Sequence, residues 1–215
     1  MAKTFAVSGQ HYLFNVQAFA HTILAEGGES YNYALRDRTT RQVIADVAAG
    51  TSELGVVVQT STTKATLDQA FAEAGVTYTA LAESSPMVAL GASHPYSNAS
   101  SLTLEELEVW PYLRFEQEDD NLAFAEEALS EVARKKVISL TDRASLSELA
   151  TAVNGYTITS GILVGITDSG SLTTIPLKTD IRLTIGVIVK KDAELSPMGQ
   201  RFLKNLEKSL KLYAK

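Results

Sequence analysis

Short runs of strand-forming residues alternate with amphipathic segments along the whole of this 215-residue chain. In the first part, the strand-like runs lie at 4–8, 30–37, 54–58 and 76–83, and the segments with apolar residues at helical spacing lie at 12–26, 39–49 and 62–74. Such alternation is typical of an α/β architecture with parallel strands. We therefore predict four strands and three helices in a first unit.

A second unit follows a stretch rich in Ser, Pro, Gly and Asn that begins near residue 83. This composition is typical of loops and of a crossing between two lobes. The predicted strands of the second unit are 86–90, 111–116, 136–140 and 162–166, with two closing β segments between 171 and 191. Its predicted helices are 103–109, 121–134 and 146–153, and a further helix closes the chain from Pro197 onward.

Several predicted helices begin with a hydroxyl residue followed three positions later by Gln or Glu, which is the spacing of a capping box. The pairs are Thr39 with Gln42, Thr103 with Glu106 and Ser145 with Glu148. Ser196 precedes Pro197, and these are residue types favoured at the cap and at the first helical position. Gly50 is expected to end the second helix of the first unit.

Composition excludes several classes of function. The formal net charge of −6 argues against binding a phosphate backbone, because that needs a basic face. The chain has no cysteine, and its three histidines, His11, His21 and His94, lack the spacing of a zinc site. We therefore expect no metal and no cofactor. No apolar run approaches the length of a membrane span, and the N-terminus does not resemble a secretory signal, so a cytoplasmic location is expected.

The stretch GYTITSGILVG, residues 155–165, suggests where a ligand could bind. It places a Thr-Ile-Thr-Ser turn directly before a segment apolar enough to be a buried strand. In open α/β folds, loops at strand ends present backbone N–H groups and hydroxyls to a cleft. Ser8 and His11 also suggest a nucleophile and a base, but no orienting carboxylate is identifiable, so we do not expect hydrolysis or other catalysis.

Three segments, in this order, resemble the effector-binding domain of LysR-type transcriptional regulators. They are TTRQVIADVAAGTSELGVV, LGASHPYSNASSLTLEELEVWPYLRF and ELSPMGQRFLKNL. The resemblance implies a two-lobed fold of the periplasmic-binding-protein type 2, each lobe a mixed sheet flanked by helices. It places the first lobe at 1–82 with 181–215 and the second lobe at 83–180. The winged helix-turn-helix of these regulators is absent from this sequence, so DNA would be bound only through that missing segment.

The resemblance further implies a small anionic effector between the lobes. Its contact positions carry over to Ser8, Gly9, Gln10, Thr39, Thr40, Phe115, Gln117, Thr159 and Ser160. Each has a structural alternative, since Ser8, Gln10 and Thr39 suit helix caps, and Thr159 and Ser160 suit hydroxyls that satisfy a loop. The predicted helices at 12–26 and 121–134 carry more apolar residues than one buried stripe needs, Phe14 among them, which suggests a second partner. The resemblance also implies a homodimer, with a tetramer possible for the full regulator. A solute-binding protein of a transport system, which shares the fold, is the alternative function.

Overall fold

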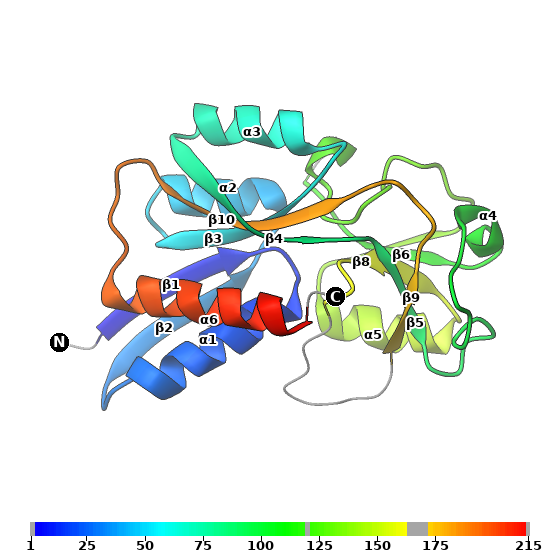
Figure 1. The fold of residues 1–215 in the computed structure, drawn as a ribbon, viewed down its shortest axis with the longest axis horizontal. Helices are drawn as coiled ribbons and strands as arrows, with labels where there is room; N and C mark the ends of the chain where they lie inside the picture. Colours follow the sequence, from blue (N-terminus) through cyan, green and yellow to red (C-terminus); the bar gives the residue numbers. More distant parts are fainter. Residues whose placement is uncertain (1–2, 119–120, 163–171, 214–215) are drawn as a thin grey trace.

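The computed structural model describes residues 3–118, 121–162 and 172–213, and these form two five-stranded sheets with helices packed on both (Figure 1). The first sheet has the order β2-β1-β3-β10-β4 and the second the order β7-β6-β8-β5-β9. The fold is therefore mixed α/β, in agreement with the predicted class. Both sheets are mixed in direction, whereas the sequence pattern suggested parallel strands.

The first sheet is formed by strands from both ends of the chain. Its strands are β1 (Lys3–Gly9), β2 (Tyr31–Asp37), β3 (Leu54–Thr60), β4 (Val76–Ser84) and β10 (Leu183–Lys190). Strand β1 runs parallel to β2 and β3, and β10 runs antiparallel to β3 and β4. Every residue of β3 is buried, as its central position and apolar sequence require.

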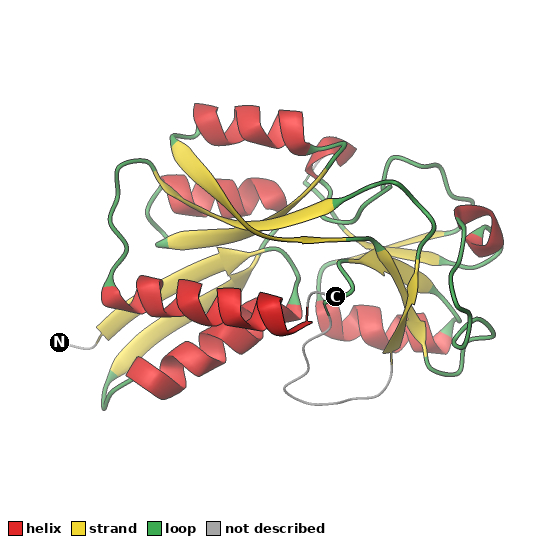
Figure 2. Cartoon of the chain, viewed as in Figure 1, coloured by secondary structure: helices red, strands yellow, loops and turns green. Residues whose placement is uncertain are grey.

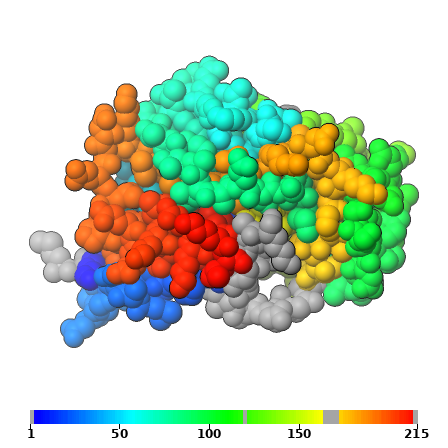
Figure 3. Space-filling view, viewed as in Figure 1, coloured from blue at the N-terminus to red at the C-terminus, as the bar shows by residue number. Residues whose placement is uncertain are grey.

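Helices cover both faces of this sheet (Figure 2). They are α1 (Leu13–Glu26), α2 (Thr40–Ala48), α3 (Lys64–Glu73) and α6 (Pro197–Tyr213). Helices α1 and α6 pack together on one face, and α2 and α3 lie on the other (Figure 1). In the space-filling view, α6 (red) lies beside the blue N-terminal segment (Figure 3). We call the first sheet with these four helices the first lobe.

The second lobe consists of the second sheet and the short helices beside it. Its strands are β5 (Met87–Gly91), β6 (Tyr112–Phe115), β7 (Val137–Leu140), β8 (Tyr156–Thr159) and β9 (Leu172–Pro176), and its helices are α4 (Leu104–Leu107), α5 (Arg143–Ala152) and the 3-10 turn η1 (Leu122–Phe124). Strand β6 runs parallel to β7 and β8, whereas β5 runs antiparallel to β8 and β9. The chain crosses between the lobes after β4 and again before β10.

The predicted helix at 121–134 is wrong. The structure has only the 3-10 turn η1 there, and the following residues lack regular secondary structure. Leu129 adopts a left-handed φ of 61°, which a helix interior does not accommodate. The apolar residues of this segment recur at helical spacing, but Glu126 and Glu127 are buried beside them and bind partners elsewhere in the fold. Tertiary contacts therefore override the local pattern.

Two local predictions near the second sheet also need correction. Helix α5 begins after Asp142, whose carboxylate accepts a hydrogen bond from Ser145 N at 2.8 Å, so Asp142 and not Ser145 is its cap. The Thr-Ile-Thr of the expected turn forms most of strand β8, which pairs with β5. The predicted strand at 162–166 lies mostly outside the described residues. The capping boxes at Thr39 and Thr103 are confirmed.

Candidate functional site

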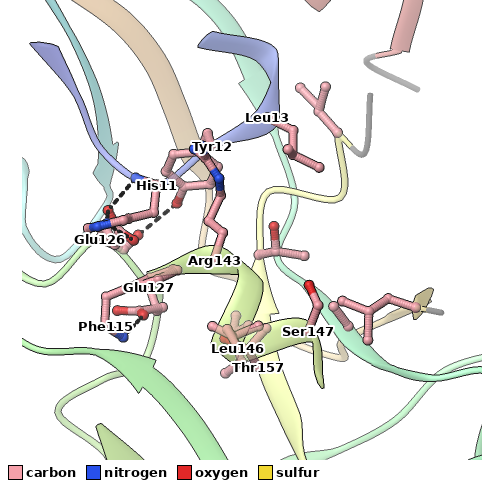
Figure 4. A pocket seen from close by; sticks show the side chains of 15 residues that line it. His11, Tyr12, Leu13, Phe115, Glu126, Glu127, Arg143, Leu146, Ser147 and Thr157 are labelled. Carbon is pink, nitrogen blue, oxygen red and sulfur yellow. Dashed lines mark hydrogen bonds and ion pairs between the residues drawn. The ribbon is translucent and has the colours of Figure 1, made fainter. Parts of the chain in front are cut away.

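A cavity of about 120 Å³ lies between the two lobes, and we call it the apolar cavity (Figure 4). The first lobe contributes the start of α1, with His11, Tyr12 and Leu13. The second lobe contributes strands β5, β6, β8 and β9, the residue pair Glu126 and Glu127, and the first turns of α5. The described residues of the second lobe that line it are Ala89, Phe115, Glu126, Glu127, Arg143, Leu146, Ser147, Thr157, Ile158, Thr159, Ile162 and Leu172.

A more open cavity of about 440 Å³ also contains residues of both lobes, and we call it the polar cavity. The first lobe contributes the end of β2 and the start of α2, and the second lobe contributes the residues after β6. Its described lining is His11, Asp37, Arg38, Thr39, Gln42, Glu116, Gln117, Glu118 and Thr141. His11 lines both cavities, so its side chain lies where they meet.

An ion pair joins the lobes beside these cavities. The Glu126 carboxylate accepts a hydrogen bond from His11 N at 3.0 Å and lies 3.2 Å from His11 Nδ1. The Tyr12 hydroxyl donates to the Glu126 carbonyl oxygen at 2.9 Å, and the His11 ring stacks on Phe115 with centroids 4.0 Å apart. Burial lowers the His11 pKa, but the hydrogen bond and negative charge of Glu126 outweigh this and raise it.

Glu127 is buried next to Glu126, with only 5% of its surface exposed. One of its carboxyl oxygens, Oε1, accepts a hydrogen bond from Phe115 N at 2.6 Å. Burial, reinforced by the neighbouring charge of Glu126, raises the pKa of Glu127 to about 8. The side chain is therefore largely protonated at neutral pH, which is unusual for a glutamate and common in functional sites.

Two further contacts bridge the lobes. Arg143, at the start of α5, pairs with Asp37 at the end of β2, with 2.8 Å between Nη2 and Oδ2. The Arg41 guanidinium lies 3.6 Å from the centroid of the Phe124 ring. Cation–π contacts of this kind contribute about 0.5–2 kcal/mol. Together with the His11–Glu126 pair, these contacts join the two lobes, and we call the arrangement in which they are formed closed.

Four of the residues predicted to bind the effector line the two cavities. Phe115 and Thr159 line the apolar cavity, and Thr39 and Gln117 line the polar cavity. Thr39 also caps α2, since its side chain accepts a hydrogen bond from Gln42 N. Capping and ligand contact therefore remain compatible at Thr39. A binding role for all four residues stays a prediction.

The other predicted contact residues do not line either cavity. Ser8 is buried and bonds to Asp46 at 2.6 Å and to Ser52 at 2.8 Å. The Gln10 side chain donates to Thr40 Oγ1 at 2.6 Å and accepts from Val58 N at 2.7 Å, so Gln10 and Thr40 bind each other inside the first lobe.

Gly9 and Ser160 also lie outside the two cavities. Gly9 lies so close to Asn15 that a Cβ atom there would collide with its side chain. Ser160 is buried beside the β4–β5 crossing, where its carbonyl accepts a hydrogen bond from Ser84 Oγ. It lines a separate cavity of about 150 Å³.

Comparison with known proteins identifies the family. Residues 32–211 match the family model of the LysR substrate binding domain, which is most of the chain. The chain belongs to this family. It is the effector-binding domain of a LysR-type regulator, and its two sheets form the two-lobed fold of the periplasmic-binding-protein type 2. The family is regulatory. No curated protein sequence matches the chain.

Solved structures share the fold of this LysR domain at low sequence identity. The effector binding domain of QuiR, in complex with shikimate, is 11% identical, with a TM-score of 0.66 and full coverage of both chains. HinK, a LysR family transcriptional regulator from Pseudomonas aeruginosa, is 14% identical, with a TM-score of 0.65 over 98% of this chain and 72% of HinK. A mutant of Corynebacterium glutamicum OxyR is 14% identical, with a TM-score of 0.68 over 99% of this chain and 65% of that protein.

The sequence interpretation missed the charged residues that meet between the lobes of this LysR domain. The sequence suggests for His11 only a role as a base beside Ser8, and Glu126 and Glu127 fall within the predicted helix at 121–134. The available signal was the Glu-Glu pair inside the apolar segment FAEEAL, because adjacent acids are seldom buried without a specific partner. The Ser8 and His11 side chains bind separate acids, Asp46 and Glu126, and not each other.

Two further properties concern the described part of the LysR domain. None of its helices combines the length and apolar character needed to cross a membrane. Within 3–118, 121–162 and 172–213, no three His, Asp or Glu side chains are grouped so that they could hold a metal ion.

Proposed function

We propose that a small-molecule effector binds between the two lobes of this LysR domain and changes how they close on each other. The observation that carries the proposal is the apolar cavity, because its walls come from the start of α1 in one lobe and from β8 and α5 in the other. Ligand pockets are concave and mostly apolar, with a few polar groups that fix orientation. The apolar cavity has these properties.

A ligand can control lobe closure only if it binds the closed form better than the open form. A molecule in the apolar cavity would contact Tyr12 of the first lobe and Thr157 of the second at once. Opening the lobes would remove one set of these contacts. The effector would thereby favour closure, and closure would be passed to a DNA-binding segment of the full regulator.

The sequence suggested that the effector is anionic, because helix N-termini attract anions. However, His11 N, just before α1, already binds the Glu126 carboxylate, so the proposal leaves the charge of the effector open. We also keep the proposed lobe boundaries, 1–82 with 181–215 and 83–180, although β4 continues to Ser84. A homodimer remains part of the proposal.

A thermal-shift screen with a broad panel of small metabolites tests the proposal. A ligand at 100 times its dissociation constant stabilises the folded state by about 2.7 kcal/mol. The site is then tested with Thr157→Val, which keeps the shape of a cavity residue and removes its hydroxyl. Thr79→Val, at an exposed position on β4, is the matched control.

We expect Thr157→Val to weaken binding of the effector found in the screen and Thr79→Val to leave it unchanged. A ligand that binds both variants and the wild type equally well, or a screen in which nothing stabilises the protein, contradicts the proposed site. Thr40→Val is a poor probe, because it would leave the buried Gln10 amide without its hydrogen-bond acceptor and destabilise the fold directly.

A further inference from the structure

One residue that lines the apolar cavity, Glu127, has a buried polar atom without a hydrogen-bond partner among the described residues. Glu127 Oε2 is fully buried and has no partner among the described residues, whereas Oε1 of the same carboxyl group binds Phe115 N. Glu127 lines the cavity together with Leu146 and Thr157, and Figure 4 shows these side chains around the same space. Unpaired buried polar atoms are rare in native proteins, because each costs about 1–3 kcal/mol. The atom is therefore a candidate ligand contact.

The cations around the cavity already have partners within the chain. Arg143 pairs with Asp37, and His11 pairs with Glu126. Among the described residues that line the apolar cavity, no cation remains for a ligand carboxylate. Glu116 and Glu118 line the adjoining polar cavity and add negative charge there. These two cavities therefore favour a ligand that carries positive charge or hydrogen-bond donors.

We infer that the effector carries an amine, that its nitrogen binds Glu127 Oε2, and that its apolar body packs against Leu146, Ile158 and Leu172. This inference rests on the proposed function and specifies the chemical class of the effector. An ammonium group donates hydrogen bonds to the oxygen that lacks a partner. A carboxylate in the same place would face Glu126 and the two oxygens of Glu127. The Arg114 charge acts on Glu127, but Arg114 does not line the apolar cavity.

Proton transfer accompanies this binding. Because burial raises the pKa of Glu127 to about 8, this carboxyl holds a proton at neutral pH before a ligand binds. An ammonium ion that binds releases this proton to solvent and forms an ion pair with the carboxylate. A neutral amine instead accepts the proton from Glu127 and forms the same ion pair. Binding of the ammonium form therefore releases up to one proton.

The size of the cavity limits the apolar body. An engineered apolar cavity of about 150 Å³ accommodates benzene. The apolar cavity, at about 120 Å³, therefore suits a short branched or small cyclic hydrocarbon group. Isopentylamine, isopentanol and isovalerate share such a body and differ only in the polar group, so they form a matched set of probes.

The inference is tested at pH 7 by protein NMR, with the amide signals of Tyr12, Thr157 and Leu172 as reporters of the cavity. We expect isopentylamine to shift these signals and to bind at least tenfold more tightly than isovalerate, with isopentanol between them. If isovalerate binds as tightly as the amine, the inference is overturned. The proposed small-molecule site is then still supported, because a ligand binds there. No shift with any of the three probes also overturns it, and the metabolite screen then decides the proposed function separately.

The role of Glu127 is tested with Glu127→Gln, which keeps the shape of the side chain and removes its charge. Glu131→Gln, at an exposed position of the same segment, is the matched control. Isopentylamine should bind Glu127→Gln at least tenfold more weakly and Glu131→Gln normally. Calorimetry in two buffers with different ionisation enthalpies should show proton release in the wild type and none in Glu127→Gln. Equal amine affinity in both variants overturns the assignment of Glu127.

Discussion

The Glu126 carboxylate binds both the backbone N–H and the Nδ1 atom of His11, a residue 115 positions earlier in the chain. His11 belongs to the turn between β1 and α1, and Glu126 belongs to the irregular segment after η1. Both are almost fully buried, with side-chain exposures of 6% and 3%. The pair therefore fixes the position of the second lobe against the first.

Glu126→Gln should weaken the closed arrangement of the lobes. The amide can still accept a hydrogen bond from His11 N but carries no charge, and hydrogen bonds to charged groups contribute about 1.5–3 kcal/mol. We expect the free energy of unfolding in urea to fall by about 1–3 kcal/mol, and the radius of gyration in X-ray scattering to increase. Glu131→Gln should change neither quantity. An unchanged stability and radius in Glu126→Gln would contradict a role for this pair in closure.

The His11–Glu126 pair should also make stability depend on pH. Burial lowers the His11 pKa, and the hydrogen bond and charge of Glu126, with a smaller contribution from Asp37, raise it to a value above 6.5. A raised pKa means that folding favours the protonated ring. This contribution is complete below pH 6.5 and is lost as the pH rises through the folded-state pKa.

An NMR titration of the His11 ring checks this expectation directly. The His11 pKa should lie above 6.5 in the wild type and fall in Glu126→Gln, where burial remains and the opposing charge is gone. A His11 pKa that is the same in both proteins would show that Glu126 does not hold the proton on the ring.

Glu127→Gln should stabilise the protein at alkaline pH. The pKa of Glu127 is raised from its ordinary value of 4.5 to about 8, because burial disfavours the charged carboxylate. The folded state therefore binds a proton that the unfolded state releases, and stability falls as the pH rises from 4.5 through about 8. Glutamine resembles the protonated acid and does not titrate.

The comparison is made by urea unfolding of wild type and Glu127→Gln at pH 5 and pH 8.5. The two should be similar at pH 5, and the variant should be more stable at pH 8.5 by on the order of 1 kcal/mol or more. A variant that is equally destabilised at both pH values would contradict a raised pKa of about 8 for Glu127.

Local sequence signals predicted much of the fold, because they depend on neighbouring residues alone. The capping box at Thr39 is present in the structure, and the alternation of strands and helices gives the first lobe correctly. The helix predicted at 121–134 is not formed, because residues of this segment bind partners that lie elsewhere in the sequence. Glu126 and Glu127 bind His11 and Phe115, and these partners cannot be recognised from spacing within the segment.

The candidate site was predicted only in part for the same reason. Thr39 and Phe115 lie at a helix start and a strand end, where a cleft in an α/β fold is expected, and both line a cavity between the lobes. The buried acids were missed because charged residues are usually solvated. Their burial depends on how the two lobes meet, which periodicity within one chain segment does not report.

A homodimer is expected from apolar residues that exceed the needs of the core, and the structure changes which residues support it. Phe14, one of these, is fully buried in the first lobe and stacks on Tyr12. The other proposed helix, at 121–134, is not formed. Near the end of α1, however, Leu24 is 84% exposed, and Tyr31, at the start of β2, is 48% exposed.

We therefore expect the end of α1 and the start of β2 to contribute to a two-fold interface, in which each contact occurs twice. Sedimentation at micromolar concentration should show a species of about twice 23.2 kDa. Leu24→Glu should shift the equilibrium toward the monomer, because the carboxylate would be desolvated twice in one interface. Ala72→Glu adds the same charge on α3, which lies on the opposite face of the first sheet, and should leave the dimer intact. A wild-type species of 23.2 kDa that does not change with concentration would exclude the dimer, and closure would then have to act within a single chain.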